Sequence, residues 1–535
     1  MSEYDYIVIG AGSAGCVVAN RLTQECETTV LLLEAGNPDT KPEIQIPLES
    51  PNLPRSELNW GYFSQPEPYL NNRKIFCPRG KVLGGSSSIN SMIYIRGNHH
   101  DYDHWQELGN PGWSYQDVLP YFKKSENQQH GADTYHGVDG ELSVTDIQAP
   151  TVASQLFVEA AVGIGYNHNP DFNGIQQEGA GIYQLTVKDG KRHSAAAAFL
   201  MPIVQRPNLT TQTEALVTRL LFEGTRAVGV EYMHDGQLHQ ARVNKEVILS
   251  AGAFDSPRLL MLSGIGDAQH LQKLGIPVIV DLPGVGQNLQ DHFLVPVAYQ
   301  IIAELNPAIT NPVVDRVIAG LDPAVTSNGN AEAGLFLHTK GNLDAAPDLQ
   351  FFFGNILWIS PGTTLSGLGF TVTVSLTHPQ NIGSVSLLSP DPKDPPIIQM
   401  NFLQSQSDVQ KVIEGIKIMR QLFNTSTFNE FRGKEVGPGA EVTSDEALEA
   451  YIRSVCVTGY HPVGTCKMGT DPMAVVDPEL RVCGVTGLRV VDASIMPTLV
   501  GGNTNAPTIM IGEKGADLIK AAGGVSQQVA STMAN

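Results

Sequence analysis

Several features that would place the chain in a specialised class of protein are scarce in its sequence. Only 6 cysteines occur in 535 residues, and none forms a C-x-x-C pair, so neither a disulfide scaffold nor a common structural zinc motif is indicated. We find no apolar window of about 18 residues and expect no membrane-spanning helix. Lys and Arg number 34 against 54 Asp and Glu, and the net charge of -20 disfavours nucleic acid and anionic membranes as partners.

The first residues also lack a basic segment followed by an apolar one, and we therefore expect a cytoplasmic protein. The 53 glycines follow no fixed period, which excludes collagen. Apolar residues make up 42% of the chain and charged residues 16%, a composition typical of a compact enzyme. A chain of 535 residues is longer than one hydrophobic core usually spans, so two or more domains are expected.

The N-terminal sequence "YDYIVIGAGSAGCVVANRL" has the pattern of a dinucleotide-binding unit. An apolar run predicts a strand, Gly10 permits a tight turn, and Gly12 lets the backbone approach a pyrophosphate. Gly15 lets the following helix pack on the strand, and the helix N-terminus favours the phosphate charge. A second predicted strand ends at Glu34, whose carboxylate can bind a ribose and would repel a 2′-phosphate. The pattern predicts FAD or NAD rather than NADP, and does not choose between the first two.

A second glycine cluster lies in "CPRGKVLGGSSSINSMIYIRGN", residues 77–98. Gly84 and Gly85 are followed by three serines, and backbone N–H groups with small hydroxyls suit a flat ring or a phosphate. A surface loop rich in serine and glycine is the competing interpretation. Apolar residues on both sides of the cluster favour burial.

His461 poses a separate question, because it stands between Cys456 and Cys466 in "VCVTGYHPVGTCKMG". It could be a metal ligand, a catalytic base or an ordinary loop residue, and this stretch alone does not decide. The absence of paired cysteines weakens the metal interpretation. The cluster of His99, His100 and His104 could also mimic a metal site, but we expect surface or core roles for these histidines and no metal.

Five blocks of the sequence resemble the signatures of the glucose–methanol–choline (GMC) oxidoreductases. They are "RGKVLGGSSSIN", "GAFDSPRLLMLSGIG", "DLPGVGQNLQDH", "YHPVGTCKMG" and "VVDASIMPTLVGGNTNAPTIMIGEKGADLI". With the N-terminal unit they extend from residue 6 to residue 519, in the order that the family has. Within the family the chain is most similar to the branch of choline dehydrogenases and acceptor-dependent alcohol dehydrogenases.

The resemblance implies an α/β fold with two domains. A Rossmann-like FAD-binding domain would comprise residues 1–295 and 451–535. A second, α+β substrate domain would comprise residues 296–450, and part of 150–200 would join it. Within 296–450, the runs "DLQFFFGNILW" and "FTVTVSLTH" predict strands of an antiparallel sheet.

The resemblance also implies FAD as the cofactor. The glycine turn would hold the pyrophosphate, Glu34 the adenosine ribose, and Val217 the adenine, while the serine-rich loop and the C-terminal segment would enclose the flavin. The residues expected at the cofactor are Gly10, Gly12, Ser13, Ala14, Gly15, Glu34, Val82, Gly85, Asn90, Ser91, Met92, Ile93, Val217, Asp492, Ala493, Asn503, Thr504 and Thr508. Some relatives attach FAD covalently through a histidine where this chain has Ile89, so we expect non-covalent FAD. Ser91 could equally be a small residue that a tight loop requires.

Alcohol oxidation by hydride transfer needs a base that takes the hydroxyl proton, and a neutral imidazole suits this role near neutral pH. The resemblance assigns the base to His461 and a polar partner for the substrate oxygen to Asn505. Pro462 restricts the backbone of His461 to extended conformations, which helps to fix its direction.

The predicted reaction is the oxidation of a primary alcohol to the aldehyde, followed by reoxidation by oxygen or a quinone-type acceptor. An acceptor in the membrane would make the protein peripherally associated with it; the oligomeric state is not predicted. Four residues favour an apolar pocket suited to an aliphatic or aromatic alcohol, although core packing is the commoner fate of such a run: Phe351, Phe352, Phe353 and Trp358. Aromatic side chains can also bind a quaternary ammonium, so choline stays open. Three competing functions are a flavin-containing hydroxynitrile lyase of the same fold, an NAD-dependent dehydrogenase and a non-catalytic binding module.

Overall fold

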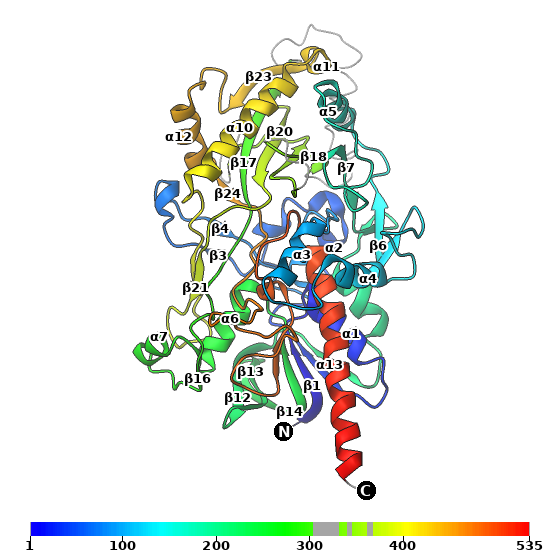
Figure 1. The fold of residues 1–535 in the computed structure, drawn as a ribbon, viewed down its shortest axis with the longest axis vertical. Helices are drawn as coiled ribbons and strands as arrows, with labels where there is room; N and C mark the ends of the chain where they lie inside the picture. Colours follow the sequence, from blue (N-terminus) through cyan, green and yellow to red (C-terminus); the bar gives the residue numbers. More distant parts are fainter. Residues whose placement is uncertain (1, 303–330, 340–344, 361–366, 534–535) are drawn as a thin grey trace.

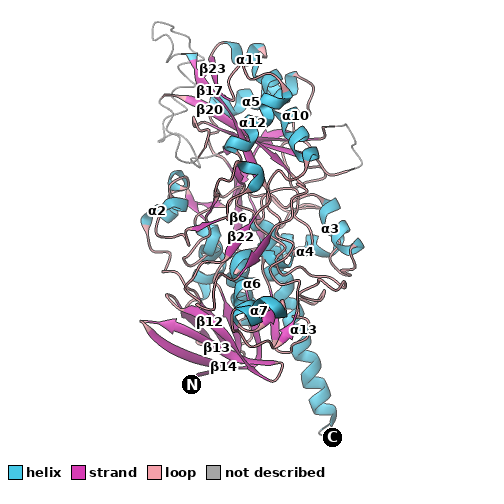
Figure 2. Ribbon diagram, turned by 90° about the vertical axis from the view of Figure 1, so that its left-hand side faces the viewer, coloured by secondary structure: helices cyan, strands magenta, loops and turns pink. Residues whose placement is uncertain are grey.

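A computed structural model describes residues 2–302, 331–339, 345–360 and 367–533 of the chain. The molecule is elongated, with one seven-stranded sheet toward each end and both termini at the same end (Figure 1). Helices and loops fill the region between the two sheets (Figure 2). In the part of the chain that the structure describes, no helix combines the length and the apolar character needed to cross a membrane.

The first sheet has the strand order β11-β2-β1-β14-β13-β12, and β25 also pairs with β14. β11, β2, β1, β14 and β25 run parallel, whereas β13 and β12 are antiparallel additions. Every residue of β2 is buried, as expected for a parallel strand that helices cover on both faces. The strands are β1 (Ser2–Ile9), β2 (Val30–Leu33), β11 (Leu209–Gln212), β12 (Leu216–Glu223), β13 (Arg226–His234), β14 (Gln237–Leu249) and β25 (Leu488–Val490).

Three helices begin at one edge of this sheet. α1 (Ser13–Leu22) follows β1, and α6 (Gly252–Leu262) follows β14, the strand next to β1. α13 (Asn505–Met533) lies along α1 (Figure 1). Arg21 of α1 donates two hydrogen bonds to the carboxylate of Glu513 in α13, from Nη2 at 2.6 Å and from Nε at 2.8 Å. The carboxyl edge of parallel strands is where ligands bind in such folds, so this packing places three helix starts around a ligand site.

The second sheet has the order β23-β17-β20-β19-β18-β7, and all of its pairings are antiparallel. The prediction of an antiparallel second sheet is therefore confirmed. β7 and the helix α5 (Val152–Gly163) belong to this body although they precede residue 296. The strands are β7 (Gly179–Ile182), β17 (Phe293–Ile301), β18 (Ala331–Leu337), β19 (Leu349–Gly354), β20 (Gly369–Leu376), β23 (Arg432–Gly437) and β24 (Val457–Thr458), the last paired with β17.

One face of the second sheet packs against α5, α10 (Gln406–Phe423) and α12 (Asp445–Val455). Phe351 and Phe353 point to this face and are fully buried in its core. Phe352 points to the opposite face, because side chains alternate along a strand. Only the middle residue of this run therefore faces the first sheet.

The remaining helices and strands that the structure describes are mostly short. The helices are α2 (Pro42–Gln45), α3 (His99–Glu107), α4 (Tyr115–Ser125), α7 (Ala268–Lys273) and α11 (Ser426–Asn429). The strands are β3 (Tyr62–Phe63), β4 (Phe76–Cys77), β5 (Glu126–Gln128), β6 (Leu142–Asp146), β8 (Gln184–Leu185), β9 (Val187–Lys188), β10 (Lys191–Arg192), β15 (Ile265–Gly266), β16 (Val280–Asp281), β21 (Ser384–Ser386) and β22 (Ile397–Gln399).

Candidate active site

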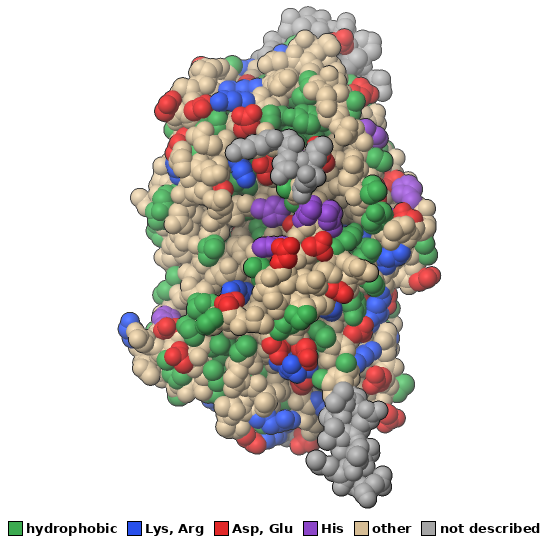
Figure 3. All heavy atoms as spheres, viewed as in Figure 1, with side chains coloured by type: hydrophobic (Ala, Val, Ile, Leu, Met, Phe, Trp, Pro, Cys, Tyr) green, Lys and Arg blue, Asp and Glu red, His purple; other side chains and the backbone are tan. Residues whose placement is uncertain are grey.

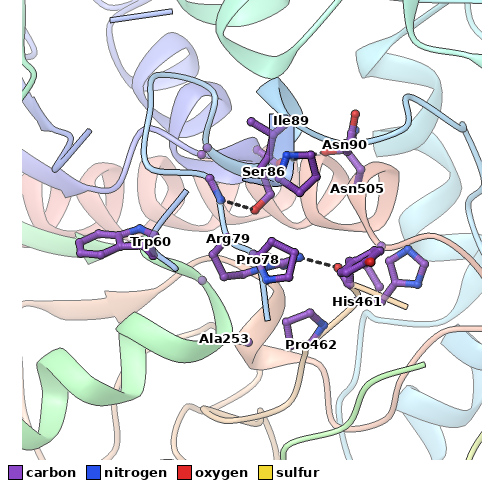
Figure 4. Close-up of a pocket in the computed structure, with 18 of the residues that line it drawn as sticks. Trp60, Pro78, Arg79, Ser86, Ile89, Asn90, Ala253, His461, Pro462 and Asn505 are labelled. Atoms are coloured by element: carbon purple, nitrogen blue, oxygen red, sulfur yellow. Dashed lines mark hydrogen bonds between the residues drawn. The ribbon is translucent and has the colours of Figure 1, made fainter. Parts of the chain in front are cut away.

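A cavity of about 600 Å³ lies between the two sheets. Its walls come from stretches far apart in the sequence. Among them are the glycine turn after β1, the serine-rich loop, the start of α6, the inner face of the second sheet, the loop that carries His461 and the segment that leads into α13. Figure 4 shows part of this wall, including Arg79, Ile89, His461 and Asn505. Segments that carry the sequence motifs thus converge on one space.

The glycine turn combines tight packing with one open position. Gly10 has φ +96°, and a side chain at Gly15 would lie 1.9 Å from the carbonyl oxygen of Gly10. At Gly12 the nearest atom to an added Cβ is 4.0 Å away, so this backbone faces open space. The turn therefore leaves room for a ligand at the start of α1, where helix N–H groups favour phosphate.

The serine-rich loop packs directly onto this turn. A side chain at Gly85 would lie 2.8 Å from the Cα of Gly12, so the loop can approach only because it lacks one. Further along, Asn90 accepts hydrogen bonds from the backbone of Met92 at 3.0 Å and from the buried Arg192 at 2.8 Å. Arg192 was not predicted to have a role at this site. Its hydrogen bond to Asn90 helps to hold the serine-rich loop in place.

Glu34, the predicted ribose-binding carboxylate, lines the cavity. Its two oxygens accept backbone hydrogen bonds from Gly36 at 2.8 Å and Ala11 at 2.9 Å. Burial raises the pKa of Glu34 to about 7. In its ionised form the carboxylate has about four acceptor positions, so two stay available for ribose hydroxyls. Together with the open Gly12 backbone, this donor and acceptor set fits an adenine dinucleotide.

Most of the residues predicted at the cofactor line this cavity. They are Gly10, Gly12, Ser13, Ala14, Glu34, Gly85, Asn90, Ser91, Met92, Ile93, Val217, Asp492, Ala493, Asn503, Thr504 and Thr508. Gly15 does not, because its role is to pack α1 against the turn. Val82 does not either, because its side chain packs in a small separate cluster with Ile44 and Ile89.

Asp492 joins the C-terminal segment to the start of α6. One of its oxygens accepts from the Gly252 backbone at 2.8 Å and from the Ser256 hydroxyl at 2.6 Å. The other accepts from the backbone of Ser494 at 2.8 Å. Burial raises the pKa of Asp492 above its usual value. These contacts fix the backbone of Asp492 and of the next residue, Ala493, both of which line the cavity.

His461 projects from the loop after β24 into the cavity. Its backbone N–H donates to Asp291 at 2.7 Å, and the preceding Tyr460 has a positive φ of 68° and accepts a hydrogen bond from Arg79 at 2.6 Å. Desolvation lowers the pKa of His461 well below its usual value, and His292 and Arg79 lower it further. The imidazole is therefore neutral at neutral pH, as a base requires.

Two amides, just before α13 and at its first residue, line the cavity. Asn503 Nδ2 lies 3.1 Å from Nε2 of His461, and Oδ1 of Asn503 is buried with no hydrogen-bond partner among the described residues. Asn505 is the first residue of α13, and its Oδ1 accepts from the Ser13 hydroxyl at 2.8 Å. The amide that touches His461 is thus two residues before the one assigned from the sequence, and the role of Asn505 toward substrate stays a prediction.

His292 was not predicted to have a role at this site. Its Nδ1 lies 2.9 Å from Nδ1 of His461, and its Nε2 lies 2.9 Å from the carbonyl oxygen of Thr377. His292 is the last residue of the block "DLPGVGQNLQDH". The resemblance of that block to the family was the signal that could have indicated a role for it. The pairing of two histidines 169 positions apart becomes visible only in the fold.

The inner face of the second sheet forms the other side of the cavity with Leu294, Phe352 and Thr373. Ile356 and Trp358, which follow the end of β19, line the cavity as well. Phe351 and Phe353, which were expected nearby, lie in the core behind it. In the described part of the chain, three acidic residues line the cavity, and each has partners in the protein: Glu34 and Asp492 as above, and Asp255 with Tyr62 and Arg258.

The remaining histidines and the cysteines form no metal site within the described residues. His99, His100 and His104 lie on α3 at the surface, where His99 is 3.7 Å from Asp103 and His104 is 3.3 Å from Glu107. Figure 3 shows histidines beside acidic residues over this region. Across the part of the chain that the structure covers, no three metal-binding side chains gather around one point, and the cysteines are free thiols.

Comparison with known proteins identifies the family of the chain. Residues 4–294 and 379–512 match the N- and C-terminal profiles of the family described as GMC oxidoreductase. The chain is 45% identical to an alcohol dehydrogenase [acceptor] of Pseudomonas putida, over 96% of this chain and 95% of the relative. It is 44% identical to an oxygen-dependent choline dehydrogenase of Sinorhizobium fredii, over 97% and 95%. The crystal structure of pyridoxine 4-oxidase from Mesorbium loti superposes with a TM-score of 0.89 at 30% identity, over 96% of this chain and 98% of that one. The chain therefore belongs to the GMC oxidoreductases, enzymes that use FAD to oxidise alcohols.

Proposed function

We propose that the protein oxidises an uncharged primary alcohol with an aliphatic or aromatic tail to the aldehyde, with His461 as the general base. The observation that carries this proposal is the position of His461. Its neutral imidazole faces a cavity that also holds the residues suited to a dinucleotide, and an amide contacts its Nε2.

Different residues of the chain have different roles in this reaction. Bound FAD supplies the acceptor for the hydride that leaves the carbinol carbon. His461 Nε2 takes the hydroxyl proton, so that an N–H bond forms as the O–H bond breaks and the oxygen's electron pair can expel the hydride. The side-chain amide of Asn505 is the proposed donor to the substrate oxygen, which steadies the developing negative charge. Such a base contributes roughly 10²–10⁴-fold to the rate.

We place the substrate on the side of the cavity that the second sheet forms, which we call the substrate end. The charges there support an uncharged alcohol over choline as the substrate. Phe352 and Trp358 could attract a quaternary ammonium through their ring faces. However, Leu294 and Thr373 supply no negative charge, the described acidic wall residues are engaged elsewhere, and Arg79 adds a positive charge near His461. A cation without a carboxylate partner is costly to remove from water. The relatives do not decide the matter, because the alcohol and choline dehydrogenases are 45% and 44% identical to the chain.

The proposal includes reoxidation by a quinone-type acceptor or by oxygen. It is supported by the two relatives, of which one is named for an unspecified acceptor and the other for its dependence on oxygen. The test is anaerobic mixing of the purified holoprotein with primary alcohols of increasing tail length, and with choline, while the visible flavin absorption is followed. Bleaching by uncharged alcohols supports the proposal. A flavin that stays oxidised with every alcohol, in a protein that cleaves a cyanohydrin, would replace it with the lyase function. Reoxidation by oxygen and by a soluble quinone is then measured in parallel.

A further inference from the structure

His292 lies directly behind the proposed base and makes one hydrogen bond on each side of its ring. The residue immediately precedes β17 and is 1% exposed. Its ring stands at 89° to that of His461, with 5.1 Å between centroids, and the two Nδ1 atoms are 2.9 Å apart. On the other side, Nε2 lies 2.9 Å from the carbonyl oxygen of Thr377.

The second contact determines where the protons are. A carbonyl oxygen can only accept, so Nε2 of His292 must carry a proton. Burial lowers the pKa of His292 to about 4, so at neutral pH the ring carries one proton and its Nδ1 has a free lone pair. The short contact between the two Nδ1 atoms then requires that His461 Nδ1 be the donor. His461 is neutral as well, so its lone pair is on Nε2.

The contact on the cavity side is consistent with this assignment. Asn503 presents its amide nitrogen, a donor, to Nε2 of His461 at 3.1 Å. A protonated Nε2 would instead require the amide oxygen, which lies buried without a partner in the described structure. Three hydrogen bonds in series, from Thr377 through His292 and His461 to Asn503, therefore agree on one tautomer of the base.

Thr377 is held firmly enough to act as the fixed end of this series. Its backbone N–H donates to the Asp348 carbonyl at 3.1 Å, and its hydroxyl contacts the carbonyl of Pro347. Because the carbonyl of Thr377 has no proton to pass on, the series cannot conduct a proton away from His461. It can only fix orientation and tautomer, a role that a carboxylate fulfils in the Ser-His-Asp triad.

We propose that His292 is a positioning residue that holds His461 in the tautomer with an unprotonated Nε2 facing the substrate. The inference rests on the proposed function, since a tautomer matters only if His461 is the base. Without the acceptor at Nδ1, the proton of His461 can move to Nε2, and the ring then has no lone pair for the substrate hydroxyl.

Two variants of the holoenzyme test the proposal, His292→Leu and His292→Asn. Leu removes the acceptor and keeps the apolar bulk, whereas the Asn side-chain oxygen can occupy the place of Nδ1. In His292→Leu we expect the limiting rate of anaerobic flavin reduction to fall roughly 10–10³-fold, within the contribution of a general base. FAD content and the apparent alcohol Kd should stay within about threefold, and His292→Asn should recover at least about tenfold of the lost rate. A wild-type rate in His292→Leu, or equal losses in both variants with FAD retained, would overturn the proposal.

A spectroscopic measurement provides a readout that does not depend on activity. Solid-state NMR of wild-type holoenzyme with isotope-labelled histidine distinguishes protonated from unprotonated ring nitrogens, and His461 is assigned by the signal lost in His461→Ala. We expect a protonated Nδ1 and an unprotonated Nε2; the reverse result contradicts the proposal even if the two His292 variants fail to fold. The rate of flavin reduction in His461→Ala distinguishes a failure of the proposed base from a failure of the positioning role of His292. If it is near normal, the base assignment itself fails, whereas a slow His461→Ala with a normal His292→Leu removes only the role of His292.

Discussion

Ser13 and Asn505 are 492 positions apart in the sequence, yet the Ser13 hydroxyl donates a hydrogen bond of 2.8 Å to the Asn505 side-chain oxygen. Each is the first residue of its helix, α1 and α13, and both line the cavity. Because the oxygen of Asn505 is engaged by Ser13, its amide nitrogen is the group that can donate to a ligand. The contact therefore leaves a hydrogen-bond donor of Asn505 available to a ligand in the cavity.

The two neighbouring amides can be separated by a matched pair of variants. We expect Asn505→Ala to lower the limiting rate of flavin reduction roughly 10- to 100-fold, because a hydrogen bond to a charged oxygen is worth about 1.5–3 kcal/mol. Asn503→Ala should lose less, because in the resting site its amide occupies the position that the substrate hydroxyl must take. Rapid-mixing measurements at saturating alcohol give both rates. A larger loss in Asn503→Ala than in Asn505→Ala would transfer the donor role to Asn503.

Removal of the base itself should have the largest effect. His461→Ala is expected to reduce flavin about 10²–10⁴-fold more slowly than the wild type, with FAD still bound. The matched control is His104→Ala on α3, which removes an exposed imidazole that does not line the cavity and should leave the rate unchanged. Near-normal reduction in His461→Ala would exclude this residue as the base.

The pH dependence of flavin reduction follows from the direction of the pKa shift of His461. The neutral imidazole is the active form, and protonation inactivates it. Because desolvation, His292 and Arg79 lower the pKa below the usual 6.5, the rate should stay constant through neutral pH and decline only below pH 6.5. Single-turnover reduction of the flavin by one alcohol, measured at each pH, isolates this step from reoxidation. An inflection above pH 6.5 would show that another group controls the reaction.

The sequence predicts the parts of this site that follow from local spacing. The glycine turn and the carboxylate at Glu34 have a signature readable from local spacing. The role of His461 was assigned only through the resemblance of its block to the family. Contacts between distant segments have no such signature. The support of Asn90 by Arg192 and the pairing of His292 with His461 depend on how the two sheets close over the cavity.

The alternation of Phe351, Phe352 and Phe353 shows a second limit. The run predicts a buried strand, and the strand is present as β19. Which residue faces the cavity depends on the side of the sheet that α5 and α10 cover, and this is a property of the tertiary packing. The side chain facing the cavity is Phe352, with its two neighbours in the core.

FAD is expected to be bound without a covalent bond. Ile89 is buried in the cavity wall, and an alkyl side chain cannot form a bond to the flavin ring. Acid precipitation of the holoprotein should therefore leave all of the yellow colour in the supernatant. Ile89→His is the matched variant, since it restores the residue through which some relatives attach the cofactor. Colour retained on the precipitated wild-type polypeptide would contradict the expectation.

Selectivity against a positive charge is best tested with choline and its uncharged isostere, 3,3-dimethyl-1-butanol, which have nearly the same shape. We expect kcat/KM to be at least about tenfold higher for the uncharged alcohol, a difference of about 1.4 kcal/mol in transition-state stabilisation.

A matched pair of variants at Thr373, which lines the substrate end of the cavity, tests the reason for this selectivity. Thr373→Glu should shift the ratio of the two kcat/KM values toward choline, because it supplies a carboxylate. Thr373→Gln, equal in size but uncharged, should not. If wild-type enzyme prefers choline, the ring faces of Phe352 and Trp358 outweigh the missing carboxylate, and the substrate is a quaternary ammonium alcohol.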